Sequence, residues 1–147
     1  MIVKTILKTK ARGAGVVTIS PQASITEAAR LLASHRIGAV IAVTEEGGIA
    51  GILSERDIVR GLAQSDGICT GAKVAELMTA NVQTCREDDS VEALMKTMTD
   101  RRIRHLPVMD GAGRLTGMVT IGDLVKSRLD EMDMEVDNLR NYVSASH

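Results

Sequence analysis

A ten-residue pattern occurs twice in this chain, and it constrains the fold more than any other feature. The first copy runs from Gly51 to Arg60 and the second from Gly117 to Lys126, an offset of 66 residues from position 51 to position 117. Each copy reads glycine, two apolar residues, a hydroxyl residue, two variable positions, aspartate, two aliphatic residues and a cation. The same ungapped register extends back to about Val17 and pairs Thr18 with Thr84, Ser24 with Ser90, Arg36 with Arg102, Ile37 with Ile103 and Gly47 with Gly113. The chain is therefore an internal duplication, and its chemistry is expected where the two copies face each other.

Length and composition describe an ordinary soluble protein. The 147 residues suffice for one domain or two small lobes, and 44% hydrophobic with 25% charged residues is a usual balance. No apolar run approaches the roughly 20 residues needed to span a bilayer. The start, Met1 to Lys4, lacks the features of a secretory signal. The sequence therefore predicts a cytoplasmic protein with no membrane partner.

Several function classes are disfavoured by what the sequence lacks. Cys69 and Cys85 form no CxxC pair and have no histidine cluster nearby, so neither a zinc site nor a disulfide framework is expected, and Cys85 reads as a packed thiol. A net charge of −1, with no Phe or Trp, offers nucleic acid neither a basic field nor a stacking platform. No nucleophile–base pair or acid–base pair is recognisable, so the protein is predicted not to be an enzyme.

The hydrophobic periodicity predicts an α/β fold of two tandem β-α-β-β-α units related by a pseudo-twofold axis, with a C-terminal amphipathic helix. Ser24, with Glu27 three residues on, predicts a capping box at the first helix. Pro107 would remove a ladder donor from a buried strand, so an edge or irregular position is expected for it. The predicted strands are 16–19, 37–43, 49–53, 82–84, 103–109 and 115–119, and the predicted helices are 24–36, 55–64, 73–78, 90–101 and 121–129.

Four segments follow from this pattern. Residues 1–64 hold a lead-in element, a mobile loop at Gly13 to Gly15 and the first repeat. Residues 65–78 are a linker with a short helix, 79–128 the second repeat, and 129–147 a further helix. In that last helix a heptad-like seam steps by three and four residues through Leu129, Met132, Val136, Leu139 and Val143. The seam has two interpretations, which the sequence leaves open: packing on its own domain, or contact with a second copy.

The repeated motif has a structural interpretation first. Ser54 to Asp57 and Thr120 to Asp123 are both hydroxyl-x-x-acid, which is a capping box at a helix start. Three features favour a further role. Aspartate is shorter than the usual Glu or Gln and is expected to reach back less well. A helix N-terminus at a sheet edge can bind an anion. Two such termini from one repeat predict a cleft between the copies.

These residues resemble the cystathionine β-synthase (CBS) domain, and the pair resembles a stand-alone Bateman module. The resemblance covers about residues 12–126. It is carried by Ile37-Gly38-Ala39-Val40 with Gly51 to Asp57 in the first copy, and by Arg102 to Val108 with Gly117 to Asp123 in the second.

The resemblance implies adenosine nucleotides (AMP, ADP, ATP or NAD(H)) bound in two clefts, with aspartate accepting both ribose hydroxyls and Ser or Thr donating to phosphate. It implies one site at Thr120 and Asp123, with Arg104 and His105 facing the phosphates and adenine against Val17, Ile37 and Gly38. The other site would use Ser54 and Asp57, with Arg56 as its nearest cation and adenine near Thr79, Val82 and Ile103. Pro107, in the same motif, completes the candidate ligand-binding set. Arg101 and Arg102 read instead as helix C-terminal cations.

The predicted function is therefore a regulatory sensor that changes conformation when a nucleotide binds. A homodimer through helices of both subunits and an unidentified protein effector are the expected partners. The alternative is a structural oligomerisation scaffold without nucleotide, in which the motif residues only cap helices. The sequence does not distinguish the nucleotides from one another, nor from S-adenosylmethionine.

Overall fold

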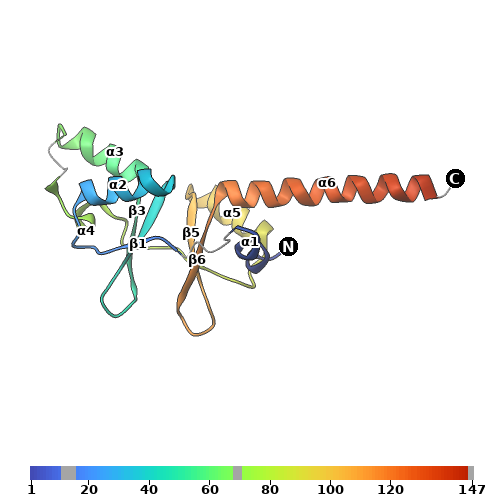
Figure 1. The fold of residues 1–147 in the computed structure, drawn as a ribbon, viewed down its shortest axis with the longest axis horizontal. Helices are drawn as coiled ribbons and strands as arrows, with labels where there is room; N and C mark the ends of the chain where they lie inside the picture. The colour runs from blue at the N-terminus through green and yellow to red at the C-terminus, as the bar shows by residue number, and fades with distance from the viewer. Residues whose placement is uncertain (11–15, 68–70, 146–147) are drawn as a thin grey trace.

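The two predicted β-α-β-β-α repeats are present in the computed structural model, which describes residues 1–10, 16–67 and 71–145. The first repeat contains β1 (Thr18–Ile19), α2 (Ile25–His35), β2 (Ala39–Val43), β3 (Ile49–Ser54) and α3 (Glu55–Gln64). The second contains β4 (Cys85–Arg86), α5 (Val91–Arg101), β5 (His105–Met109), β6 (Leu115–Thr120) and α6 (Ile121–Ala145). Two further helices, α1 (Val3–Lys10) and α4 (Val74–Leu77), precede the repeats. Figure 1 shows the two lobes side by side, with α6 projecting from the second. The loop predicted at residues 13–15, and Cys69, lie outside the described residues.

Each repeat builds one three-stranded sheet with its hairpin strands antiparallel and its first strand parallel, in the orders β1-β2-β3 and β4-β5-β6. Ser24 and Ser90 begin the helices that follow the first strands, and each accepts a backbone N–H three residues on at 3.1 Å. Both helices bury one apolar face, which explains why the spacing of apolar residues in the sequence predicted them.

Pro107 accounts for a strand that lies later than predicted. In the first sheet, β1 begins to pair with β2 at Ile41, whose N–H also donates to the carbonyl of Val17 (3.4 Å). The repeat places Pro107 at the position of Ile41, and proline has no N–H to donate. Parallel pairing therefore starts one residue later, at Val108, and β4 lies at 85–86 instead of 82–84. Pro107 is in the central strand and not at a sheet edge, and it directly precedes the first residue of β5 that pairs with β4.

The short helices α1 and α4 are exchanged between the repeats. The N–H groups of Val3 and Lys4 donate to carbonyls at positions 89 and 87 of the second repeat, at 3.0 and 2.8 Å. Those of Val74 and Ala75 donate in the same way to positions 23 and 21 of the first repeat, at 2.8 and 2.9 Å. Each repeat is thus closed by the helix that precedes the other one, as Figure 1 shows from the places of α1 and α4.

The exchange reveals that the duplication is longer than the ungapped register indicated. Position 3 corresponds to 74 and position 4 to 75, an offset of 71, whereas the repeats themselves are offset by 66. The segment between α1 and β1 is therefore five residues longer than the one between α4 and β4, since 71 − 66 is 5. That length difference hid the equivalence from an ungapped comparison.

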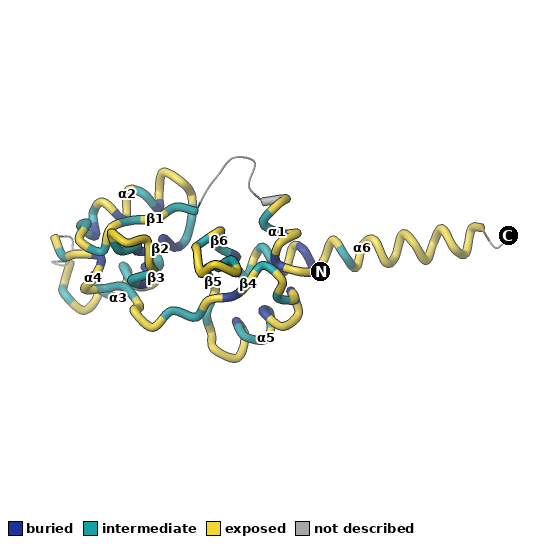
Figure 2. Tube along the Cα trace, turned by 90° about the horizontal axis from the view of Figure 1, so that it is seen from below, coloured by how far each residue is buried: buried dark blue, intermediate teal, exposed yellow. Residues whose placement is uncertain are grey.

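Two separate cores follow from this arrangement. Val74 completes the first core, which is built from α2, β2 and β3, while Val3 and Ile6 complete the second, built from α5, β5, β6 and the start of α6. Buried segments therefore occur in both lobes (Figure 2). Cys85 is part of the second core, as predicted; burial, with a smaller effect of Asp89, raises the pKa of its thiol to about 12.

The C-terminal helix is one continuous element. The sequence predicted a helix that ends near 129 and a second helix after it, and this division is wrong. No glycine or proline follows Gly122 in α6, so the helix continues without a break to Ala145. From Met132 onwards every described residue of α6 is exposed, as Figure 2 shows. The interpretation in which this segment packs on its own domain is therefore wrong. Among the described residues, no helix is long and apolar enough to cross a membrane.

The motif glycines provide a test of the exchanged helices. A Cβ on Gly51 would lie 2.6 Å from Met78 Sδ and 2.8 Å from the backbone oxygen of Thr79, whereas the three atoms nearest to a Cβ on Gly117 all belong to the Leu7 side chain, the first at 2.6 Å. Because a side chain yields more easily than backbone, Gly51→Ala should lower the free energy of unfolding by about 1–3 kcal/mol and Gly117→Ala by less. Urea unfolding of both variants measures the difference. Gly111→Ala, which meets nothing within 4 Å, is the control; equal losses for the two motif glycines would contradict the packing described.

Candidate functional site

A cavity of about 300 Å³ lies between the two repeats. Three segments form it: the start of α3 in the first repeat, the chain that joins α4 to β4, and the approach to β5 in the second repeat. Its volume is at the lower end of the range of small-molecule sites. The lining residues are Gly38, Ile52, Ser54, Glu55, Arg56, Asp57, Arg60, Thr79, Asn81, Val82, Gln83, Arg102, Ile103, Arg104 and His105.

Reciprocal hydrogen bonds fix the motif side chains at both helix starts. Asp57 Oδ2 accepts from the Ser54 N–H (3.0 Å) and from its hydroxyl (3.1 Å), while Ser54 Oγ accepts from the Asp57 N–H (3.2 Å). At α6, Asp123 Oδ2 accepts from the Thr120 N–H (2.9 Å) and Thr120 Oγ1 accepts from the Asp123 N–H (3.1 Å). The expectation that aspartate reaches back poorly is therefore wrong, and the capping role alone explains the hydroxyl-x-x-acid pattern.

The cap also orients Asp57 toward the cavity. Its Oδ2 is engaged by Ser54, while Oδ1 lies 3.8 Å from Arg60 Nη1. The side chain is only 11% exposed, although it lines the cavity. A carboxylate held in this way presents a fixed, charged acceptor, and two adjacent hydroxyl groups are suitable donors for it.

Arginine is the most frequent residue type on the cavity wall. Four arginines, at positions 56, 60, 102 and 104, line the cavity together with two carboxylates, Glu55 and Asp57. Among the described residues only Arg60 of these four has an ion pair. A second hollow of about 490 Å³ adjoins the first and shares Arg56, Arg102, Ile103 and Arg104 with it. The cavity can therefore hold an anionic group at the end where the two hollows meet.

Two of these arginines were not in the predicted site. Arg60 follows Asp57 by three residues on α3, a spacing that places both on one helix face and could have indicated it. Arg102 was interpreted as a helix C-terminal cation, and its N–H does cap α5 by donating to the Met98 carbonyl. Its side chain lines the cavity as well. Ile52, Glu55, Asn81 and Gln83 also line the cavity and were missed, because no residue pattern in the sequence marked them.

The backbone of Arg102 is unusual for its residue type. It has φ 55°, in the left-handed region, and its repeat equivalent Arg36 has φ 54°. Glycine is the usual residue at such a helix end, and a side chain there costs about 1–2 kcal/mol. At position 102 an arginine thus occupies a site where local backbone preference favours glycine, and this arginine lines the cavity.

His105 accounts for the difference between the two repeat sequences. A Cβ on Gly38 would lie 3.3 Å from His105 Nε2, so the imidazole packs closely on the glycine of the other repeat. The repeat equivalents of Gly38 and Ala39 are Arg104 and His105. Because the two copies approach here, a bulky side chain from one copy requires a small residue in the other. The asymmetry is therefore a packing requirement, and it makes the two sides of the interface chemically different.

The second predicted cleft, at Thr120 and Asp123, stays a prediction, because much of its expected lining falls outside the described residues. Arg104 and His105, assigned from the sequence to a site with Thr120 and Asp123, line the Ser54 and Asp57 cavity instead of forming a described cavity with that pair. Asp123 lines a different hollow, against α1. Val17 and Ile37 pack on the first core, Gly38 lines the first cavity, and Pro107 is buried in β5. The segment corresponding to residues 79–83 lies between α1 and β1 and falls largely on residues 11–15, outside the described part.

The other residues assigned to the Ser54 and Asp57 site are brought together: Arg56, Thr79, Val82 and Ile103 all line that cavity. Their roles toward a ligand remain predictions. Within residues 1–10, 16–67 and 71–145, no cluster of three His, Cys, Asp or Glu side chains could hold a metal ion.

Comparison with known proteins identifies the fold. A family model described as the CBS domain matches residues 10–64 and again residues 74–130. The structure of the CBS-domain containing protein ATU1752 from Agrobacterium tumefaciens is 41% identical with a TM-score of 0.82, over 87% of this chain and 99% of that one. The CBS domain pair of protein MJ0100, solved in complex with 5′-methylthioadenosine and S-adenosyl-L-methionine, is 34% identical with a TM-score of 0.76, over 90% and 98%.

Some relatives are much longer than this chain. Inosine-5′-monophosphate dehydrogenase from Mycobacterium tuberculosis is 36% identical over 131 residues, which are 88% of this chain but 24% of the dehydrogenase. The chain likewise spans 62% of the mitochondrial protein CBSX3 of Arabidopsis thaliana. What is shared with these proteins is the tandem pair of repeats, and the chain belongs to the CBS-domain family.

Proposed function

We propose that this protein is a regulatory module that binds an adenosine phosphate in the Asp57 cavity. The observation that carries the proposal is a cavity between the repeats with an oriented carboxylate and with three arginines, at positions 56, 102 and 104, that form no ion pair within the described part of the chain. A ribose diol suits the carboxylate, and phosphate suits the arginines. The related MJ0100 pair is complexed with 5′-methylthioadenosine and S-adenosyl-L-methionine, which share the adenosine group.

The charges favour a phosphorylated ligand over S-adenosylmethionine. With four arginines against two carboxylates, the wall has a formal charge of +2 when His105 is neutral. A sulfonium cation would be repelled there, whereas each phosphate adds a charge-assisted contact. Arg56, Arg102 and Arg104 lie where the two hollows meet, so that end would take the phosphates. AMP, ADP, ATP and NAD(H) all meet this requirement.

The adenine would lie against the segment that joins α4 to β4, with Ile52, Val82 and Ile103 as its apolar contacts. The carbonyl of Gln83, on the same wall, corresponds to that of Val17, which accepts from Ile41. Because the equivalent donor is replaced by Pro107, no backbone N–H of the described chain donates to Gln83. Its carbonyl could accept from the adenine amino group, which would give Pro107 an indirect part in the site.

Regulation would follow from the position of the cavity. A ligand held by Asp57 in the first repeat and by Arg102 and Arg104 in the second restrains the two lobes relative to each other. It would shift the population toward the arrangement that it binds better, and so change the surface offered to a partner.

The alternative is the scaffold without nucleotide, which is favoured by one observation: both caps are complete without a ligand.

Asp57→Asn tests the part of the carboxylate in ligand binding. Asparagine keeps an oxygen for the Ser54 N–H but loses the negative charge, so the unfolding free energy should fall by less than about 1 kcal/mol. Affinity for the bound adenosine phosphate should fall by about 10- to 100-fold, the range of a lost hydrogen bond to a charged group. Titration calorimetry with AMP, ADP, ATP, NAD, NADH and S-adenosylmethionine, with GMP and CMP as controls, identifies which compound binds. The same titrations measure how much affinity the Asp57→Asn variant loses.

Asp123→Asn is the matched control, since it makes the same change at the equivalent cap and should leave binding at the Asp57 cavity intact. If Asp123→Asn abolishes binding and Asp57→Asn does not, the site assignment is wrong. If ligand-free wild-type protein binds none of these compounds, the scaffold replaces the sensor.

A second prediction uses the backbone of Arg102. Arg102→Gly removes a cation while placing glycine in its preferred conformation, so stability should stay unchanged or rise by about 1 kcal/mol or less. Affinity for the phosphorylated ligand should fall a few-fold at low salt, because exposed charge pairs are weak and screened, while affinity for adenosine should not change. Arg36→Gly is the control. It makes the same change at a residue with the same backbone conformation (φ 54°) that is not among the lining residues of the cavity, so it should change stability by the same amount as Arg102→Gly and leave ligand affinity unchanged. Equal affinity losses for adenosine and its phosphates would remove Arg102 from the phosphate site.

A further inference from the structure

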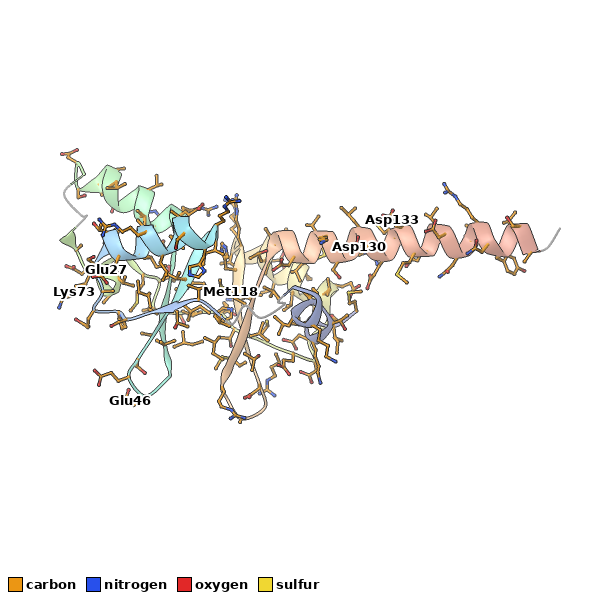
Figure 3. All side chains as sticks on the ribbon, in the orientation of Figure 1. Glu27, Glu46, Lys73, Met118, Asp130 and Asp133 are labelled. Atoms are coloured by element: carbon orange, nitrogen blue, oxygen red, sulfur yellow. The ribbon has the colours of Figure 1, made fainter. Side chains whose placement is uncertain are left out.

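An apolar stripe follows α6 out of its own lobe. It consists of exposed aliphatic side chains separated by four and three residues in alternation, which is the spacing of a coiled-coil seam. Its members, here called the α6 stripe, are Val125, Leu129, Met132, Val136, Leu139 and Val143, with exposures from 41% to 63%. Beyond position 131, each member of the stripe is at least 47% exposed. Asp130 and Asp133 lie on this projecting part of the helix (Figure 3).

We propose that the α6 stripe binds the α6 stripe of a second copy of this chain in a parallel, in-register, two-stranded coiled coil. The partner is identified by self-complementarity, because the residues that flank the stripe carry charges that match only when two identical helices run in the same direction. With Leu129, Val136 and Val143 at heptad position a, the seam has Val125, Met132 and Leu139 at position d. In the outer half of the stripe, Val136 and Val143 at a with Leu139 at d form the combination that favours two strands.

The flanking charges distinguish the two orientations. In a parallel pair, a residue at position g faces the residue five places later, at position e, of the other helix. Arg128 then faces Asp133, and Glu135 faces Arg140, so both pairs are attractive. An antiparallel pair that keeps the whole stripe buried would place Asp133 against Asp133 and Glu135 against Glu135. Arg128 already pairs with Glu131 of its own helix at 3.0 Å, and the Asp133 carboxylate would join that pair.

The globular lobe supplies a preformed start for the helix, which a short isolated coiled coil lacks. The 25 residues of α6 extend about 37 Å, and an isolated seam of this length would be marginal because starting a helix is costly. Here Leu124 and Ser127 are buried in the lobe, and the Thr120–Asp123 cap fixes the first turn. The helix is therefore already formed where the stripe begins at Val125. Only the pairing itself remains to be stabilised by burial of the stripe.

The first test is the molar mass of the full chain over a range of concentrations, by light scattering or sedimentation. The wild-type protein should be a dimer, and Val136→Lys, at the centre of the stripe, should shift it toward monomer by at least tenfold in dissociation constant. Met134→Lys is the matched control, since Met134 is also an exposed apolar residue (64%, against 47% for Val136) and lies on the opposite side of α6. Circular dichroism verifies that both variants remain folded. A monomeric wild type, or a dimer that Val136→Lys leaves intact, overturns the proposal.

The second test fixes the orientation by disulfide formation in a Cys69→Ser background. Leu129→Cys and Leu139→Cys should each form a covalent dimer alone, because identical positions meet in a parallel pair, whereas these two positions face each other in the antiparallel pair that buries the whole stripe. In an antiparallel pair, only a mixture of the two variants would be linked efficiently. Cys85 is 4% exposed and should not compete. Linkage only in the mixture overturns the parallel arrangement. Pairing does not involve the nucleotide, so its failure would leave the Asp57 proposal unaffected.

Discussion

The exchange of α1 and α4 is the constraint on which the rest of the structure depends. Asp57 belongs to the first repeat and Arg102 and Arg104 to the second, so the cavity exists only while the repeats keep a fixed orientation. The exchanged helices supply that orientation, because Val3 completes the core of one repeat and Val74 that of the other. Each also adds paired backbone hydrogen bonds across the boundary. Separating the lobes would open both cores, and core stability and site geometry are therefore linked.

Departures from the repeat matter as much as the repeat itself. Gly38 admits the imidazole of His105, and the approach of the two copies allows a large side chain from only one of them. Pro107 removes the donor that Ile41 supplies in the first sheet, which moves β4 by a residue and leaves the Gln83 carbonyl without a backbone donor in the described chain. Two substitutions thus convert a symmetric frame into an interface with two different sides. Equivalent ligands at both clefts are not to be expected from such a frame.

Most of the fold could be predicted from the sequence, because strands, helices and helix caps are specified by short stretches of residues. The 66-residue repeat presents each of these patterns twice. The capping boxes and the cavity residues Ser54, Asp57, Thr79 and Ile103 followed from that register and the family resemblance. What failed has physical causes. The exchange of α1 was hidden by a five-residue difference in connector length, which no local pattern reports. Arg102 was interpreted only as a helix-end cation, because its left-handed backbone and its direction toward the other repeat are tertiary features. The end predicted near 129 assumed a helix stop that the residues do not provide.

The two motif helices differ in what they can transmit. Helix α3 ends at Gln64, whereas α6 begins at the equivalent cap and continues as one rigid element into the stripe that we assign to the dimer. A ligand at Asp57 touches α3 directly, but the arginines opposite it lie just after α5, which packs against α6. Contacts therefore run from the cavity through the end of α5 to the helix that would join two subunits. A change in lobe orientation at the cavity would move the start of α6, and over a helix of 25 residues a small rotation at its base becomes a large displacement at its tip.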